Sequence, residues 1–99
     1  SDLEMADNAS KMVTEAIDAF VKSDIEVAKK VARQDDIVDE LFNRSKNETV
    51  ELIHKNKDLG SEALDIVMIA KYLERIADHA VNVAEWVAFS ITGSCDLPD

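Results

Sequence analysis

Four side chains with oxygen donors recur along one stretch of the chain, at Glu74, Asp78, Asn82 and Glu85. If the stretch is a helix, which turns by about 100° per residue, these side chains fall within a stripe roughly 80° wide. Carboxylate and amide oxygens are ligands for hard cations, and Asp and Glu on facing helices build the metal sites of many bundle proteins. We call these four residues the acidic stripe and take it as a candidate metal-binding face.

A solvated face is the alternative interpretation of the acidic stripe. Lys71 and Arg75 lie three or four residues from Glu74 and Asp78, which is the spacing of ordinary helix-surface ion pairs. The stripe nevertheless borders a line of alanines, so it is expected to point toward a neighbouring helix. Asn82 favours the metal interpretation, because asparagine is a poor helix former and adds a neutral oxygen to the line.

A second acidic pair occurs at Asp35 and Asp39, one helical turn apart. Asp35 occupies a slot in an otherwise mostly apolar four-three pattern, where a carboxylate loses hydration and needs a hydrogen bond, a cation or a proton. Pairing with Lys30 or with a lysine on another helix is one solution. A role in fixing the helix register, as buried asparagines have in coiled coils, is another.

The elements that must position these residues are three helices. With two glycines and one proline in 99 residues, the chain has few turn signals. Capping-box patterns start at Ser1 and Ser23, a loop is expected at 56–60 with Ser61 as a cap, and Gly93 offers a stop. We therefore expect an all-α fold of helices at about 3–22, 24–56 and 61–92. They form one domain over 1–99, an antiparallel up-down-up three-helix bundle.

Apolar spacing supports the bundle. The first helix is expected to bury one face and the third to bury an alanine-rich seam that lets its neighbours approach closely. The expected first face is Met5, Ala9, Met12, Ala16 and Phe20, and the expected third seam is Ala63, Ile66, Ala70, Leu73, Ala77, Ala80, Ala84, Val87 and Ile91. Trp86 and Phe89 fall away from this seam, so we expect them to pack on something outside a three-helix core or to complete a wide apolar face.

Charge and composition restrict the function. The formal net charge of −10 argues against binding to nucleic acid or to anionic lipid and favours cations or a basic partner surface. The single cysteine, Cys95, cannot form an intrachain disulfide, which fits a reducing compartment. We see no signal peptide and no apolar run near the ~20 residues of a membrane span, so a cytoplasmic protein is expected.

Two segments resemble a known family. The run AKYLERIADHAVNVAEWVAFSITG, residues 70–93, resembles the C-terminal signature of PhoU, a bacterial regulator of phosphate uptake. The run KKVARQDDIVDELF, residues 29–42, is similar to the family's second-helix motif. The first helix follows the family's looser pattern, so the resemblance spans nearly the whole chain.

The resemblance implies a ligand set. PhoU-like proteins consist of two similar three-helix repeats whose Glu/Asp-x-x-x-Asp motifs can bind metal clusters, often of iron. Here the motifs are Asp35-x-x-x-Asp39 and Glu74-x-x-x-Asp78, and Asn82 and Glu85 are weaker candidates. We expect iron first, with manganese, magnesium or calcium as alternatives. Gln34 replaces a residue that is often acidic in the family, which leaves the metal count open.

The resemblance also implies a function. It implies a non-enzymatic regulator that acts on the phosphate ABC transporter and on its sensor histidine kinase, at the inner face of the membrane through these partners. The chain looks like one repeat, which could pair with itself or with a second repeat. One rival is a plain helical interaction module without metal. Another is a di-metal carboxylate enzyme, which is disfavoured because such sites usually use Glu-x-x-His and we expect no such motif in this chain.

Overall fold

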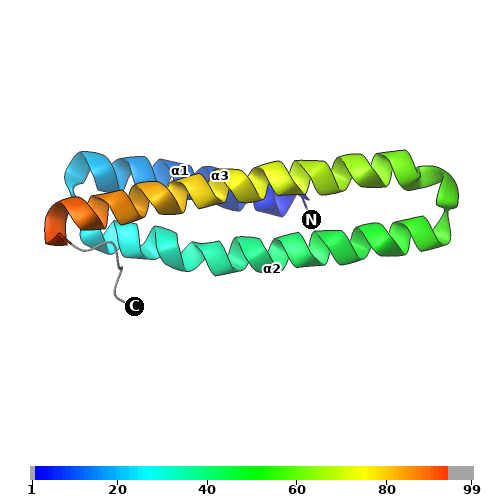
Figure 1. The fold of residues 1–99 in the computed structure, drawn as a ribbon, viewed down its shortest axis with the longest axis horizontal. Coiled ribbons are helices and arrows are strands. Elements are labelled where there is room, and N and C mark those ends of the chain that lie inside the picture. Colours follow the sequence, from blue (N-terminus) through cyan, green and yellow to red (C-terminus); the bar gives the residue numbers. More distant parts are fainter. Residues whose placement is uncertain (1, 94–99) are drawn as a thin grey trace.

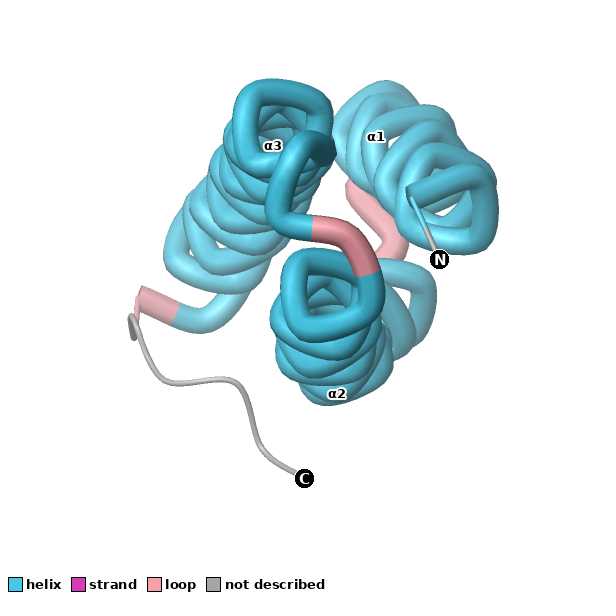
Figure 2. Tube along the Cα trace, turned by 90° about the vertical axis from the view of Figure 1, so that its right-hand side faces the viewer, coloured by secondary structure: helices cyan, strands magenta, loops and turns pink. Residues whose placement is uncertain are grey.

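The computed structural model describes residues 2–93 and shows three long antiparallel helices. They are α1 (Asp2–Lys22), α2 (Ile25–Lys55) and α3 (Gly60–Thr92), with a single 3₁₀ turn, η1 (Lys57–Leu59), between α2 and α3 (Figure 1). Seen end-on, the helices occupy the corners of a triangle (Figure 2). The expected all-α, up-down-up bundle is confirmed, with each helix end within one residue of its expected position.

The turn between α1 and α2 departs from the expected cap. Ser23 has a left-handed φ of 52°, and Asp24 caps α2 instead. Asp24 Oδ1 accepts hydrogen bonds from the backbone N–H groups of Glu26 at 3.0 Å and Val27 at 3.3 Å. The expectation that Ser23 caps α2 was wrong. Ser23 adopts the left-handed conformation and completes the turn, so the capping position falls on the next residue, Asp24.

The turn between α2 and α3 also uses a different cap. The Asn56 side chain accepts from the Asp58 N–H at 3.0 Å, which closes η1, and α3 starts at Gly60 after Leu59 with no side-chain cap. Ser61 therefore lies inside the helix. Gly93 ends α3 as expected, in the left-handed conformation that glycine adopts without cost, and its N–H bonds the Phe89 carbonyl at 2.8 Å. The expected cap at Ser1, like Cys95, lies outside the described residues.

The core is narrow and rich in alanine. The fully buried side chains come from all three helices, and the larger ones are Met5, Met12, Val31, Val38 and Val87. On α1 the buried line ends at Ala19, whereas Phe20 is 58% exposed and does not join the face predicted for it. Ile91, expected in the third seam, is also exposed. The small alanine side chains of α3 let the backbones of α1 and α2 lie close to the backbone of α3.

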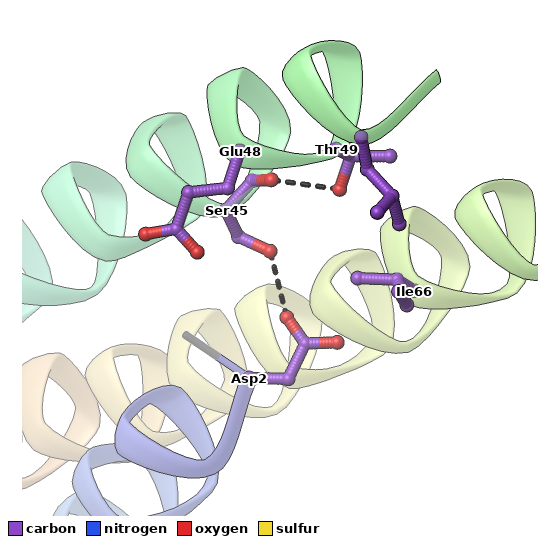
Figure 3. Close-up of a pocket in the computed structure, with 6 residues that line it drawn as sticks. Asp2, Ser45, Glu48, Thr49 and Ile66 are labelled. Atoms are coloured by element: carbon purple, nitrogen blue, oxygen red, sulfur yellow. Dashed lines mark hydrogen bonds between the residues drawn. The ribbon is translucent and has the colours of Figure 1, made fainter. Parts of the chain in front are cut away.

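The bundle has an overhang at one end, because α1 has 21 residues whereas α2 has 31 and α3 has 33. Ser45 Oγ donates a hydrogen bond to Asp2 Oδ1 at 2.7 Å, so α1 begins level with a point about two thirds of the way along α2 (Figure 3). Beyond that level only α2 and α3 continue, for roughly 15 Å at the helical rise. A hollow lined by Thr49, Leu52 and Ile66, among others, opens there between them.

No helix within residues 2–93 is long and apolar enough to cross a lipid bilayer.

Candidate metal centre

The acidic motifs of α2 and α3 face each other across the contact between these helices. Burial first, and then the negative charges of Asp39, Asp78, Asp36 and Glu74, together raise the pKa of Asp35 to about 6. Because Asp78 and Glu74 belong to α3, their effect on Asp35 shows that the two motifs are close in space. This juxtaposition agrees with the arrangement that the family resemblance implied.

Asp39 is near the same charged groups as Asp35 but is more exposed to solvent. Its pKa is raised by burial first and then by Glu74, Asp78 and Asp36, whereas Lys71 lowers it. Five carboxylates, those of Asp35, Asp36, Asp39, Glu74 and Asp78, therefore contribute negative charge here, and the ammonium of Lys71 partly offsets it. We call Asp35, Asp39, Glu74 and Asp78 the carboxylate cluster.

Asp35 is the least satisfied member of the cluster. Its Oδ1 atom is buried and has no hydrogen-bond partner among the described residues. The suggested partner, Lys30, instead pairs with Glu15 of α1 at 3.4 Å. A buried acceptor without a partner costs about 1–3 kcal/mol, and more when it is charged. The Asp35–Lys30 pair is therefore not the compensation for this carboxylate.

Beside Asp35, the buried polar residue of α2 is Gln34, which the apolar spacing did not place in the core. Gln34 is 8% exposed, and its Nε2 donates to Glu15 Oε2 at 3.3 Å. Asp35 is only partly buried and lies at the edge of the core toward α3. Val31 and Val38, which flank this slot in the apolar pattern, are buried as expected, so the seam shifts only locally, from Asp35 to Gln34. This shift leaves Asp35 beside the carboxylates of α3 and off the core axis.

Within the acidic stripe, the ion-pair interpretation applies to Glu74. Lys71 Nζ lies 2.7 Å from Glu74 Oε1 and also 5.5 Å from the centroid of the Phe42 ring. Arg75 stacks over Tyr72, with its Cζ atom 5.9 Å from the ring centroid. Asp78 has no ion pair or hydrogen bond to any side chain in the part of the chain that the structure describes.

Asn82 and Glu85 lie apart from the cluster. Together with Trp86 and Phe89 they line a shallow hollow further along α3. Neither is among the groups that shift the pKa of Asp35 or Asp39. Trp86 is 59% exposed, and its ring centroid lies 5.9 Å from that of Phe89. Both aromatic residues therefore remain outside the three-helix core, as the sequence indicated.

The cluster suits a hard cation in its donor chemistry but does not form a closed ligand shell. Between residues 2 and 93, no three His, Cys, Asp or Glu side chains converge closely enough to hold a metal ion. An unpartnered buried oxygen amid like charges is nevertheless what a cation would neutralise. The expectation that the chain has no Glu-x-x-His motif is wrong, because Glu51 and His54 have this spacing. Both are exposed, and they lie roughly 18 Å and 22 Å along α2 from Asp39.

Comparison with known proteins gives a single family. The sequence model of the PhoU domain matches residues 3–87. A phosphate-specific transport system accessory protein PhoU homolog from Clostridium acetobutylicum is 33% identical over 96 residues, which are 96% of this chain and 44% of that protein. Homologs from Thermotoga maritima and Pseudomonas aeruginosa are 34% and 38% identical over 91% and 85% of this chain, and 39% and 35% of their own lengths. The chain thus spans less than half the length of these relatives. No solved structure matches it.

Proposed function

The chain belongs to the PhoU family, and on that premise we propose that it acts as a non-enzymatic regulator of phosphate-specific transport and of phosphate-starvation signalling. The observation that carries this proposal is the match of the PhoU domain to residues 3–87, which include all three helices up to Val87. The relatives are named as accessory proteins of a phosphate-specific transport system, which supports the same conclusion.

The proposed partners are components of the phosphate ABC transporter and its sensor histidine kinase, contacted at the inner face of the membrane. A net charge of −10 gives the bundle a negative field that attracts basic surfaces on such partners. A rigid bundle of long helices suits an adaptor, because it presents a docking face without a large ordering cost.

The carboxylate cluster is the proposed metal-binding face. Asp35, Asp39, Glu74 and Asp78 would hold the cation, with Asn82 and Glu85 as outlying donors, and iron is placed before manganese, magnesium or calcium. The unpartnered Oδ1 of Asp35 supports this assignment. A bound cation would supply positive charge that offsets the repulsion among the four carboxylates, and thereby fix α2 against α3.

The regulatory proposal is tested in a bacterial strain that lacks its own PhoU and carries a reporter of phosphate starvation. Expression of this chain should lower the reporter signal in phosphate-rich medium. The matched control is a chain of the same length with Met12→Asp, which places a charge in the buried core and should abolish the effect. An unchanged reporter with the folded wild-type chain present would refute regulation by this chain.

The metal proposal is tested separately, by elemental analysis of the purified chain after loading with iron(II) or manganese(II). Glu74→Gln/Asp78→Asn should lose the metal while keeping its helicity. Glu62→Gln/Asp65→Asn is the matched control, because it removes the same two charges from exposed positions on the same helix. Equal metal content in both variants, or none in the wild type, would make the cluster a plain docking face, an alternative that the Lys71–Glu74 ion pair favours.

A further inference from the structure

The overhang of α2 and α3 has an open groove on the side where α1 lies lower in the bundle. In the described part of the chain α1 begins at Asp2, whereas α2 and α3 run on together to the η1 turn (Figure 1). The hollow at the base of this overhang has a volume of about 400 Å³, which is too large for one side chain to fill. We call it the overhang groove and define it by its lining residues, Asp2, Ser45, Glu48, Thr49, Leu52 and Ile66.

The overhang groove continues the position that α1 occupies lower in the bundle. Ser45 faces α1, because its hydroxyl donates to Asp2 at 2.7 Å. Leu52 lies two helical turns after Ser45 on the same face of α2, and Ile66 lies on the opposite wall, on α3 (Figure 3). An occupant that packs on Leu52 and Ile66 therefore meets α2 and α3 in the way that α1 does. Over the roughly 15 Å of the overhang, a helix of about ten residues fills this position.

The two edges of the overhang groove carry carboxylates that lack a cation. Glu48 lines the groove, Glu51 lies three residues further along α2, and Glu62 lies one turn before Ile66 on α3. All three are exposed, and none forms an ion pair with another residue between 2 and 93. Lower in the bundle, acidic side chains do have such partners, in the pairs Glu4–Arg44, Glu15–Lys30, Asp18–Lys22 and Glu74–Lys71.

The negative charge of these edges favours a positively charged occupant. Lys55 and Lys57 are the lysines nearest the far end of the groove, but they lie at the η1 turn beside Asp58 and offset only part of the charge. Unpaired charges along a groove with an apolar floor attract a ligand of the opposite sign and orient it. The occupant that fits both the shape and the charge is a basic helix with one apolar face.

We propose that the overhang groove binds a basic amphipathic helix of a partner protein, which takes the place of a third helix beside α2 and α3. The apolar side chains of the partner helix, three and four residues apart, pack on Leu52 and Ile66. Its lysines or arginines lie along the two edges, opposite Glu48 and Glu51 on α2 and Glu62 on α3. The proposal is independent of phosphate regulation and of metal binding, because the site contains no member of the carboxylate cluster.

A second copy of this chain is a poor occupant of the groove. It carries the same net charge of −10, and the lysines of its α1, Lys11 and Lys22, already pair with Glu15 and Asp18. A helix of about ten residues also buries less than the ~1,200 Å² at which standard interfaces begin, so its association is weak and transient. We therefore expect a dissociation constant of about 10–300 µM.

Binding of a labelled model peptide, followed by fluorescence anisotropy, tests the site. The peptide has about twelve residues, with leucines at helical spacing along one face and lysines and alanines elsewhere. The titration is done at physiological salt, where general attraction to the acidic chain is screened beyond about 8 Å. We expect saturable binding of this basic peptide by the wild type, and no binding of a peptide that has glutamates in place of the lysines.

Two variants of the chain separate the apolar and the charged parts of the interaction. Ile66→Glu removes the apolar wall on α3, and Glu48→Lys/Glu62→Lys reverses the charge of both edges. Each should weaken binding by about tenfold or more. Asp7→Lys/Glu40→Lys is the matched control, because it makes the same change in net charge at exposed positions outside the groove, and it should bind within about threefold of the wild type. Circular dichroism verifies that each variant keeps its helices.

Hydrogen exchange locates the bound peptide. Binding should slow exchange of the backbone amides of residues 46–55 and 60–67 and leave those around Val31 unchanged. The proposal is overturned if the wild type does not bind the basic peptide at up to about 1 mM, or if the acidic peptide binds equally well. Protection outside the overhang would also overturn it, as would equal weakening by the control and by Glu48→Lys/Glu62→Lys. Self-association of the wild type that Ile66→Glu abolishes would make a second copy the occupant and overturn it as well.

Discussion

Replacing Asp35 by asparagine should stabilise the metal-free protein at neutral pH. The folded chain holds the Asp35 carboxylate where burial and neighbouring carboxylates raise its pKa from 3.8 to about 6. The folded state therefore binds this proton more tightly than the unfolded state does. The contribution of Asp35 to stability is therefore greatest below pH 3.8, falls as the pH rises from 3.8 to about 6, and stays low above that. Asparagine has nearly the same shape and does not ionise, so the variant should lack this loss.

The size of the effect follows from the same pKa. A rise from 3.8 to about 6 corresponds to about 3 kcal/mol of unfolding free energy at pH 7.5. Asp35 keeps some contact with solvent, which screens the repulsion, so we expect a gain of about 1–2 kcal/mol for Asp35→Asn. For a chain of this length that gain raises the thermal midpoint by roughly 4–15 °C. The residual repulsion on Asp39 remains in the variant.

The assay is thermal unfolding followed by far-ultraviolet circular dichroism, with chelator present, at about pH 4 and pH 7.5. Asp65→Asn serves as the control, because Asp65 is an exposed aspartate on α3 whose charge is not among those acting on the cluster. Wild type and Asp35→Asn should have similar midpoints near pH 4 and separate near pH 7.5. The reasoning is refuted if the variant is no more stable than the wild type at pH 7.5, or if its advantage is equally large at pH 4.

Two further predictions concern the bundle itself, and both are measured by urea denaturation. Met12→Ala should lower the unfolding free energy by about 2–5 kcal/mol, because Met12 is fully buried among all three helices, whereas Met68→Ala on the exposed side of α3 should cost less than about 1 kcal/mol. Asp24→Ala should cost about 1 kcal/mol by removing the cap of α2, and Ser23→Ala should change stability by less than about 0.5 kcal/mol. Equal losses within either pair would contradict the packing or the capping assignment.

The architecture could be predicted because the chain carries so few signals that interrupt a helix. Two widely spaced turn regions and a terminal Gly93 leave room only for three long helices. The positions of these turn signals also predict where each helix begins and ends. Which residue of a turn makes the cap could not be predicted at Ser23–Asp24. Both side chains can cap, and the choice depends on the left-handed φ of Ser23, a property of the turn and not of either residue type.

The rotation of each helix about its own axis was harder to predict from the sequence than the helix boundaries. Phe20 and Ala19 both continue the α1 face at acceptable spacing, and so do Gln34 and Asp35 on α2. The angles at which three helices cross decide between such neighbours, and those angles depend on packing contributed by all three. The opposition of Asp35 and Asp39 to Glu74 and Asp78 came from the family motif, since periodicity alone does not say which helix faces which.

The unequal helix lengths imply that the two ends of the bundle open at different rates. Beyond the Asp2–Ser45 contact, α2 and α3 each have one neighbour instead of two, and residues 46–55 of α2 contain a single buried side chain, Thr49. Local opening costs least where few apolar contacts are lost. Backbone amides of this two-helix end should therefore exchange with deuterium well before those around Val31 and Ala77, so that unfolding begins at the η1 turn and proceeds toward the carboxylate cluster.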